Sequence, residues 1–229
     1  MTITLFELAG ADRSLRFAPH CWKSKLALVH KQLSYKTEAV WFTEKEKFAF
    51  AEQPLLPVIT DGEEVISDSW KIAEYLEANY TDKPSLFANT EAKVKAEEFH
   101  QWLSSVLSKH IPGILILDLY NVIAEQDKEY FRTSREERIG TTLEEFAATP
   151  EKHIKGLQAE LSPVRESLAD QDYLGGDTPD YRDICLLGTF LWIATSGTPE
   201  FLEKDDIIYA WYQRVLKVYN DVIPKAVLV

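Results

Sequence analysis

The sequence predicts a small mixed α/β domain followed by a larger all-α domain. Three observations carry this prediction. The first eighty or so residues alternate short β-rich runs with helical periods, in the order β-α-β and then β-β-α. Residues 81–90 show neither period and include Pro84. Beyond them, apolar residues recur only at helical spacing. We therefore expect the first domain at residues 1–82, a linker at 83–90 and the helical domain at 91–229.

The elements of the first domain can be placed in order. Residues 2–8 alternate and are β-rich, which predicts a strand. A helix is expected from about Pro19, and residues 35–40 form a second strand candidate. Residues 57–60 and 64–67 flank Asp61 and Gly62, which indicates a hairpin, and residues 69–80 have a helical period. The apolar face of the first helix comprises Trp22, Leu26, Val29 and Leu33.

The second domain is expected to be helical throughout. An apolar stripe that starts at Val94 is predicted to be interrupted at Pro112, because proline removes a helical hydrogen bond. A second stripe runs from 157 to 168, with Pro163 near a helix start or kink. Asp180 can cap the apolar helix that follows it. Asp183, in the first turn, complements the helix dipole and resembles the acid of a capping box.

Charge and composition exclude several classes of protein. The 229 residues include 25 Lys and Arg against 37 Asp and Glu, a formal charge of −12. Nucleic-acid binders need a surplus of cations to displace phosphate counterions, so we expect neither nucleic acid nor an anionic membrane as a partner. A hydrophobic content of 45% argues against disorder.

The same sequence favours a cytoplasmic location without metal. Glu7 and Asp12 interrupt the opening apolar stretch, so no secretory signal is expected. The longest uncharged run, residues 184–199, is too short and too polar to span a bilayer. Cys21 and Cys185 form no disulfide framework, which fits a reducing compartment. The five histidines show no zinc-ligand spacing, so no metal site is predicted.

Three stretches give the chain a resemblance to cytosolic glutathione transferases. They are Leu56-Pro57 before the hairpin, residues 67–76 (SDSWKIAEYL) and residues 174–183 (LGGDTPDYRD). More narrowly, the chain is similar to the etherase-related branch, which includes bacterial lignin β-etherases and fungal relatives. The supporting stretches are residues 18–28, Asp118 with Tyr120, residues 126–127 with 130–132, residues 134–136 and residues 190–192. The resemblance implies a thioredoxin-like first domain that holds glutathione as cosubstrate, and a homodimer.

That resemblance assigns four residues to glutathione. Pro57 would be cis and would leave the backbone N–H and C=O of Leu56 free to pair with the cysteinyl part of the peptide. Ser69 would bind the γ-glutamyl carboxylate at the start of a helix, where free N–H groups favour an anion. Asp68 would face the ammonium group. An ordinary strand-start proline and simple helix capping are the alternatives, and capping can coexist with anion binding.

The chain departs from the family pattern at the catalytic position. Where relatives have a reactive Cys or Ser, this chain has Ala18. Cys21 matches the second cysteine of a redox pair, which is not the attacking residue. Glutathione therefore needs another donor near its sulfur, because a thiol with a pKa of about 8.5 is only a few per cent thiolate near neutral pH. Ser14 is the leading candidate for the catalytic donor; a solvated loop serine and stabilisation by the helix N-terminus alone remain open.

A second departure concerns the glycyl carboxylate of glutathione. Relatives often carry Lys or Arg two positions before the conserved proline, and this chain has Leu55 there. Lys45, Lys47 and Gln53 are the candidates to replace that group.

The electrophile is expected in a cleft between the domains. Trp102, His110, Tyr120 and Trp192 are candidates for its aromatic wall, although any one of them can equally be a core residue. Residues 132–138, which contain three arginines with Glu136 and Glu137, are interpreted as a solvated helix face.

The sequence thus predicts a glutathione transferase that directs glutathione thiolate at a hydrophobic electrophile, with aryl-ether cleavage as a candidate reaction. Two alternatives stay open. One is a non-catalytic relative that binds hydrophobic ligands or a protein partner, which the missing hydroxyl at Ala18 and missing cation at Leu55 favour. The other is a glutathione-dependent disulfide reductase that uses Cys21.

Overall fold

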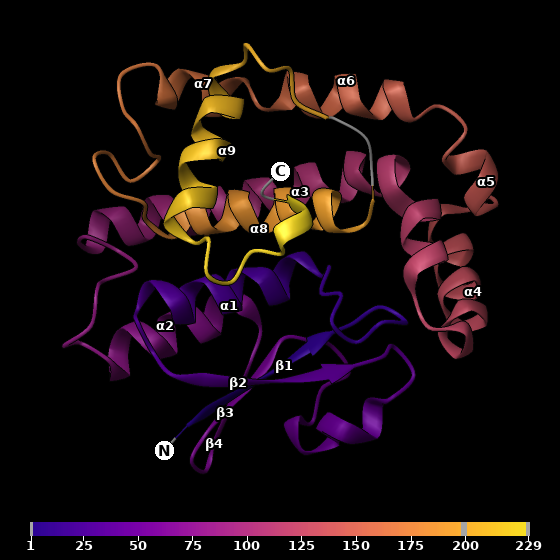
Figure 1. Ribbon diagram of the computed structural model, residues 1–229, viewed down its shortest axis with the longest axis horizontal. Coiled ribbons are helices and arrows are strands. Elements are labelled where there is room, and N and C mark those ends of the chain that lie inside the picture. Colours follow the sequence, from indigo (N-terminus) through magenta and orange to yellow (C-terminus); the bar gives the residue numbers. More distant parts are fainter. Residues whose placement is uncertain (1, 198–200, 228–229) are drawn as a thin grey trace.

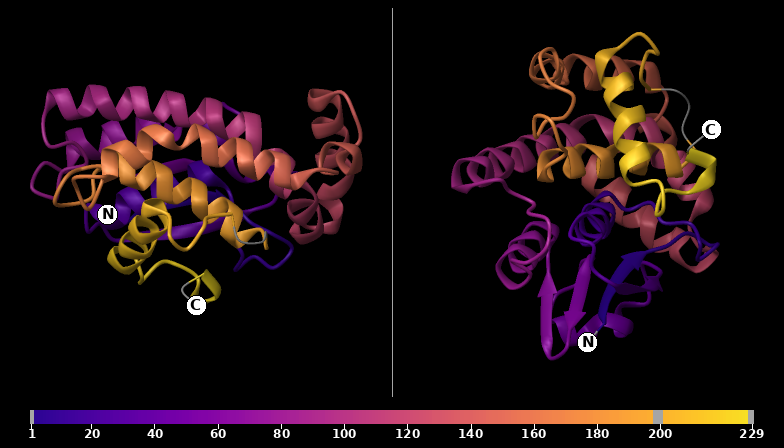
Figure 2. Two further views of the ribbon diagram at one scale, coloured as in Figure 1. Left: turned by 90° about the horizontal axis from the view of Figure 1, so that it is seen from above. Right: turned by 60° about the vertical axis from the view of Figure 1, so that its left-hand side comes forward.

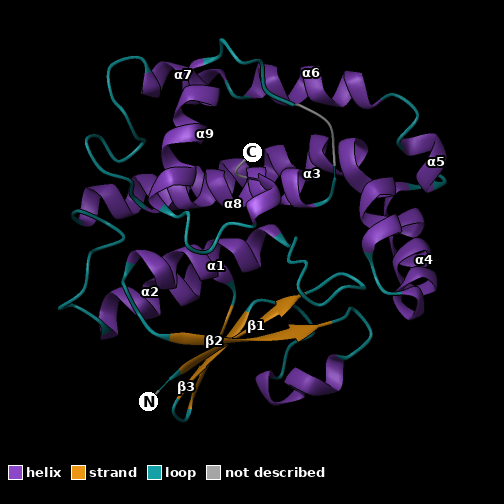
Figure 3. Cartoon of the chain, viewed as in Figure 1, coloured by secondary structure: helices purple, strands orange, loops and turns teal. Residues whose placement is uncertain are grey.

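The computed structural model describes residues 2–197 and 201–227. A four-stranded sheet lies at one end of the molecule, and a larger set of helices covers the face on which α1 and α2 pack (Figure 1). Figure 3 shows that all labelled strands belong to the first domain, and that the second domain contains helices and loops only. The predicted fold class, a thioredoxin-like domain followed by an all-helical domain, is confirmed.

The sheet has the strand order β2-β1-β3-β4. Strand β1 pairs in parallel with β2, as Leu5 opposite Thr37, and antiparallel with β3, as Leu5 opposite Ile59. A parallel neighbour requires a crossover, and α1 provides it. The hairpin predicted around Asp61 is the β3-β4 pair. The strands are β1 (Ile3–Leu8), β2 (Tyr35–Val40), β3 (Val58–Asp61) and β4 (Glu64–Ser67).

Each face of the sheet has its own apolar cluster. Helices α1 (Pro19–His30) and α2 (Ser69–Asn79) bury Leu26 and Leu76 in the main core. The 3-10 helix η1 (Lys45–Ala51) contributes Phe48 to a smaller cluster with Val40 and Val58. Strand β1 alternates between buried and half-buried residues because successive side chains point to opposite faces: Ile3 and Leu5 lie in the main core, and Phe6 packs against the smaller cluster.

The second domain begins with one long helix. Helix α3 runs from Thr90 to Val122 without a break, so the predicted interruption at Pro112 is wrong. Ile111 and Leu115, on either side of the proline, are both almost fully buried. We attribute the continuity to this packing, which offsets the cost of about 3 kcal/mol that a proline imposes on a helix interior.

Shorter helices surround α3 and α8. Helices α6 and α7 lie on the side of α3 and α8 remote from the sheet, and α4 and α5 lie at one end (Figures 1 and 2). Asp180 and Asp183 form the capping box of α8, as predicted. The elements are η2 (Glu125–Asp127), α4 (Lys128–Ile139), α5 (Leu143–Phe146), α6 (Pro150–Glu160), α7 (Ser162–Leu168), α8 (Tyr181–Thr195), α9 (Ile207–Val218) and η3 (Lys225–Val227).

Specific contacts fix the two domains against each other. Helix α1 packs on α8 at Gly188, where an added Cβ would lie 3.1 Å from the backbone nitrogen of Lys23. The hydroxyl of Tyr181 donates to the carbonyl of Ser69 at 2.9 Å. The fully buried carboxylate of Asp127 accepts hydrogen bonds from the backbone N–H groups that follow β2, at 2.9 and 3.0 Å. These contacts set the shape of the space between the domains.

Candidate active site

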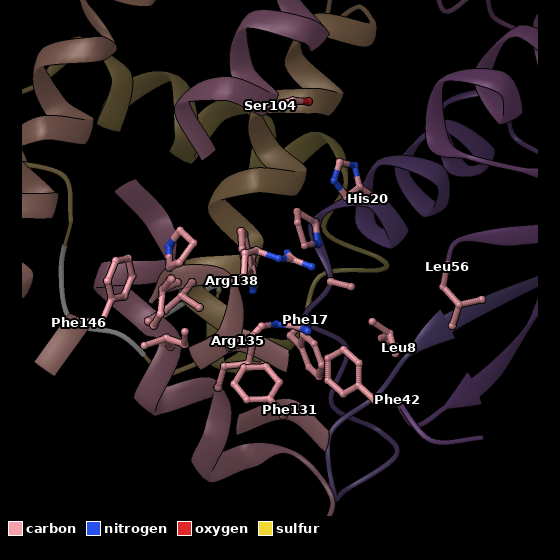
Figure 4. Close-up of a pocket in the computed structure, with 18 of the residues that line it drawn as sticks. Leu8, Phe17, His20, Phe42, Leu56, Ser104, Phe131, Arg135, Arg138 and Phe146 are labelled. Atoms are coloured by element: carbon pink, nitrogen blue, oxygen red, sulfur yellow. The ribbon is translucent and has the colours of Figure 1, made fainter. Parts of the chain in front are cut away.

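A cavity of about 590 Å³ opens between the two domains. The first domain contributes Leu8, Leu56 and the start of α1, and the second contributes one face each of α3 and α4 together with Trp192 of α8. Figure 4 shows Phe17, Phe42 and Phe131 grouped at one side of the cavity, with Leu8 and Leu56 beyond them. Its wall is mostly apolar, which suits a hydrophobic ligand.

The N-terminus of α1 faces this cavity. Ala18 is the N-cap residue, and no side chain caps the helix. Pro19 occupies the first turn and has no N–H, so the backbone N–H groups of His20 and Cys21 are the first donors of the helix. Uncapped donors and the positive end of the helix dipole together favour an anion at this point. The helix end can therefore stabilise a thiolate without a side-chain hydroxyl at position 18.

The peptide bond between Leu56 and Pro57 is cis, as the resemblance implied. The ladder of β3 begins at Val58, which pairs with Phe6 and Ser67, so Leu56 lies outside the sheet. Leu56 also lines the cavity. Its backbone is thus placed where an extended peptide could pair with it.

Helix α2 begins with the predicted Asp68-Ser69 pair. Asp68 has a positive φ of 78° and caps the helix by accepting from the N–H groups of Trp70 and Lys71, at 2.9 and 3.1 Å. Ser69 is 1% exposed, and its hydroxyl has no partner among the described residues. An unpartnered buried hydroxyl beside a helix N-terminus is what a carboxylate ligand would satisfy.

Two more buried polar atoms lie near this corner. The Nζ of Lys23 and the Nδ1 of His100 have no hydrogen-bond partner in the described part of the chain. Burial lowers the pKa of Lys23, while the nearby Cys185 and Asp68 act in the opposite direction. Burial and the charge of Lys23 lower the pKa of His100 to about 4. Asp68 is therefore the one carboxylate named at the start of α2, and the other buried polar groups described there can donate hydrogen bonds to an anion.

Cys21 is poorly suited to thiol chemistry. Its side chain is 1% exposed, and burial, with a smaller contribution from Glu7, raises its pKa to about 12. A reactive cysteine needs an accessible thiolate. The disulfide-reductase alternative therefore loses its main support.

Ser14 lies in the loop between β1 and α1, on the surface. Its backbone N–H donates to the Oδ1 of Asp12 at 2.7 Å, and it is not among the residues that line the cavity. Its neighbours are engaged elsewhere, since Arg13 forms an ion pair with Glu44. A catalytic role for Ser14 remains a prediction to which this position lends no support.

The candidates to replace the cation at Leu55 are also placed. Lys47 pairs with Glu44 at 3.3 Å and with Glu38 at 3.5 Å. Gln53 hydrogen-bonds with the backbone of Leu55. Lys45 lies over the Tyr130 ring, 5.1 Å from its centre, and has no carboxylate partner among the described residues. Lys45 is the cation of this set that is left available for a ligand.

Of the four predicted wall residues, Trp192 lines the cavity and the other three do not. Trp102 packs on Phe99 over a separate shallow hollow, with ring centres 5.2 Å apart. His110 contacts His153 of α6, and Tyr120 lies beneath Arg132. Because α3 is a single continuous helix, only one of its faces can point to the cavity, and the three predicted residues lie on its other faces. The cavity face carries residues 104, 109, 112, 115, 116 and 119.

The solvated face predicted on α4 agrees with the exposure of Arg138 and with the ion pairs of Arg132, and it is wrong for Arg135, which is partly buried. Arg132 pairs with Glu136 and Glu144, both at 2.8 Å. Arg135 and Arg138 also line the cavity, and Figure 4 shows both side chains reaching into it. A signal for this was present in the sequence, since position 135 lies one turn from both Phe131 and Ile139 and shares their apolar face.

Within residues 2–197 and 201–227, no three His, Cys, Asp or Glu side chains are placed together as a metal ion would require. No helix in the same residues is long and apolar enough to cross a membrane.

Comparison with known proteins agrees with the geometry. The family model of the glutathione S-transferase N-terminal domain matches residues 14–84, and that of the glutathione S-transferase C-terminal domain matches residues 96–220. The chain is similar to the glutathione transferase GSTFuA3 of Phanerochaete chrysosporium, with 26% identity, a TM-score of 0.85 and coverage of 96% of this chain and 97% of that one.

Two further structures are similar over nearly their full length. GSTFuA2 of the same fungus has 25% identity and a TM-score of 0.84, with coverage of 96% and 98%. The glutathione S-transferase CsGST63524 of Ceriporiopsis subvermispora, solved in complex with glutathione, has 23% identity and a TM-score of 0.85, with coverage of 98% and 100%. At 23% identity this last likeness speaks for the fold alone.

Proposed function

The chain belongs to the glutathione S-transferase family, and from this premise we propose that it transfers glutathione to a hydrophobic electrophile bound in the cavity between its domains. The observation that carries the proposal is the position of the uncapped N-terminus of α1, which faces the same cavity that Leu56 lines. One end of the cavity therefore offers donors for a thiolate, and the rest offers an apolar surface for its target.

Glutathione would be held along the first domain. The backbone of Leu56, outside the sheet ladder, pairs with the cysteinyl unit, and cis-Pro57 shapes that segment. The hydroxyl and the backbone N–H of Ser69 take the γ-glutamyl carboxylate, and Asp68, which caps the next two N–H groups of α2, takes the ammonium. Lys45 is available for the glycyl carboxylate in place of a cation at Leu55.

The thiol loses its proton to solvent, and the first amides of α1 stabilise the thiolate that remains. His20, which lines the cavity, is held neutral because surrounding protein and the charge of Lys23 lower its pKa, so its ring can donate one hydrogen bond. The sulfur then forms a bond to the electrophilic carbon, and the leaving group departs with the electron pair of the broken bond. The rest of the rate acceleration comes from holding the thiolate and the electrophilic carbon in a reactive orientation.

The bound thiol itself provides the test. Glutathione is titrated calorimetrically, and the thiolate absorbance of the complex is followed against pH. We expect the thiol pKa to fall by about one to two units from its free value, as helix N-termini do for cysteine thiols. Ser14→Ala should leave that shift unchanged if α1 provides it. A protein that does not bind glutathione, or binds it without a shift, would be a ligand-binding relative rather than a transferase.

The reaction type needs substrates of two kinds. A chloronitrobenzene reports conjugation, and an aryl ether with a fluorescent phenol as leaving group reports ether cleavage. Release of the phenol that depends on glutathione would support the etherase-related assignment, and conjugation without ether cleavage would restrict the enzyme to transfer.

We further propose that the enzyme is a cytoplasmic homodimer, with no nucleic acid or membrane as a partner. Light scattering on the purified protein tests the dimer, and a monomeric mass at micromolar concentration would contradict it.

The alternative of a non-catalytic binding protein rests on Ala18, which lacks the hydroxyl or thiol found in relatives. This alternative predicts ligand binding in the apolar cavity without turnover of any electrophile.

A further inference from the structure

The charges around the cavity oppose those of the whole protein. The chain has 12 more acidic than basic residues, yet the described lining of the cavity includes Lys109, Arg135 and Arg138 and no aspartate or glutamate. Lys109 is neutralised by an ion pair with Glu160. The net positive charge of the cavity wall therefore comes from the two arginines of α4.

Arg135 sits among aromatic rings. Its guanidinium lies 4.8 Å from the centre of the Phe131 ring and 5.4 Å from that of Phe42, and its Nη1 donates to the hydroxyl of Ser134 at 2.9 Å. No carboxylate pairs with it among the described residues. Burial and the nearby Arg138 lower its pKa, which means that the charge is held in an unfavourable place. An ion without a counterion in a partly buried site is stabilised when an anion binds.

Arg138 lies one turn further along the same helix and also faces the cavity. It has no hydrogen bond or ion pair with any described residue, although Glu136 and Glu137 are close in sequence. Arg132, by contrast, is fully engaged with Glu136 and Glu144 on the outer face of the helix. Helix α4 therefore carries two arginines that line the cavity without a carboxylate partner among the described residues, the inner pair, and one, Arg132, that is ion-paired outside the cavity.

We propose that Arg135 and Arg138 bind an anionic group on the electrophile, so that the preferred cosubstrates are aromatic molecules that bear a carboxylate or sulfonate. The apolar wall holds the aromatic body, and the planar guanidinium groups match the oxygens of the anion. That the bound anion is a cosubstrate rests on the proposed function. That the cavity binds aromatic anions rests on the residues of the cavity alone.

Two dyes of nearly equal shape test the binding without catalysis. 8-Anilinonaphthalene-1-sulfonate carries the anion, and N-phenyl-1-naphthylamine lacks it. The variants are Arg138→Glu and the double substitution Arg135→Gln with Arg138→Gln, and Arg132→Gln on the outer face is the matched control. Circular dichroism of each variant checks folding, and Arg138→Glu, at an exposed position, keeps the test open if the double variant misfolds.

We expect the dissociation constant of the sulfonate dye to rise about tenfold in both inner variants, in line with the loss of a charge-assisted contact. The neutral dye should change less than about twofold, and Arg132→Gln should affect neither dye. Equal weakening of both dyes, or a sulfonate affinity that does not respond, would overturn the proposal.

Turnover gives a second readout with 4-(bromomethyl)benzoate and its methyl ester, which share a reacting carbon and differ in charge. The ratio of their kcat/KM values should fall about tenfold in Arg138→Glu. Turnover of both compounds with an unchanged ratio refutes the anion subsite and leaves the transferase standing. Turnover of neither, with no glutathione binding, refutes the proposed function while the dyes still decide the role of the arginines. A tenfold rise in the KM for glutathione with unchanged dye preference would assign the arginines to glutathione instead, and would also refute the proposal.

Discussion

Replacing Asp183 by asparagine should destabilise the protein through two orphaned donors. In the native protein, the Oδ1 of Asp183 accepts from the N–H of Leu174 at 2.9 Å and from the indole N–H of Trp211 at 2.7 Å. Its Oδ2 accepts from the N–H groups of Gly175 and Asp180, at 2.9 and 3.0 Å. Asparagine keeps one oxygen and presents an NH₂ group to the other pair, so two N–H groups lose their acceptor.

The magnitude follows from burial. Asp183 is 0% exposed, and each buried donor left without a partner costs about 1–3 kcal/mol, for a total of about 2–6 kcal/mol. Burial also raises the pKa of Asp183, which shows that its charge is costly, so removal of the charge returns part of this loss. We therefore expect a loss in the lower part of the range, about 2–4 kcal/mol, equivalent to a fall in Tm of roughly 4–16 °C for a chain of this size.

The assay is thermal and urea unfolding at one protein concentration, with Asp172→Asn as the control. Asp172 undergoes the same chemical change on the surface, where its side chain is 72% exposed, and should lose less than about 0.5 kcal/mol. If Asp183→Asn also loses less than about 1 kcal/mol, the four hydrogen bonds do not hold the start of α8 as the structure indicates.

Three further predictions concern the site. Ser69→Ala should raise the Kd for glutathione about tenfold with little change in kcat at saturating glutathione, because a buried hydroxyl is lost from the γ-glutamyl end; an unchanged Kd in calorimetry would remove Ser69 from the site. Cys21→Ala should keep its turnover, and the native Cys21 thiol should resist a disulfide reagent until urea is added, since burial raises its pKa to about 12; rapid labelling of the folded protein would contradict this. His100, whose pKa burial lowers to about 4, takes up a proton in the unfolded chain near pH 6.5 but not in the folded one, so its contribution to stability is present above pH 6.5 and is lost as the pH falls toward 4. Urea unfolding at pH 7 and pH 5 should therefore show a smaller loss for His100→Asn than for the native protein, and equal losses would refute the assignment.

The parts of this protein that the sequence alone determined are those governed by neighbouring residues. Strand β1, the β3-β4 hairpin and the capping box of α8 depend on local alternation, turn residues and caps, and each was predicted close to its observed position. The Asp68 cap is local in the same way, whereas the cis Leu56-Pro57 bond was expected from the resemblance of a short motif to a family.

Only the tertiary structure decided what faces the cavity. Because of its packing, α3 continues through Pro112 as one helix. The face that this continuous helix turns to the cavity carries Lys109 and Leu119, whereas Trp102 and Tyr120 lie on other faces. Which side of α4 is buried likewise depends on contacts with residues distant in sequence, such as the contact between Phe131 and Phe42. The spacing of residues along α4 does not reveal these contacts. The orientation of a helix about its own axis is set by the elements that bury it, and the orientation of α4 placed two arginines on the cavity wall.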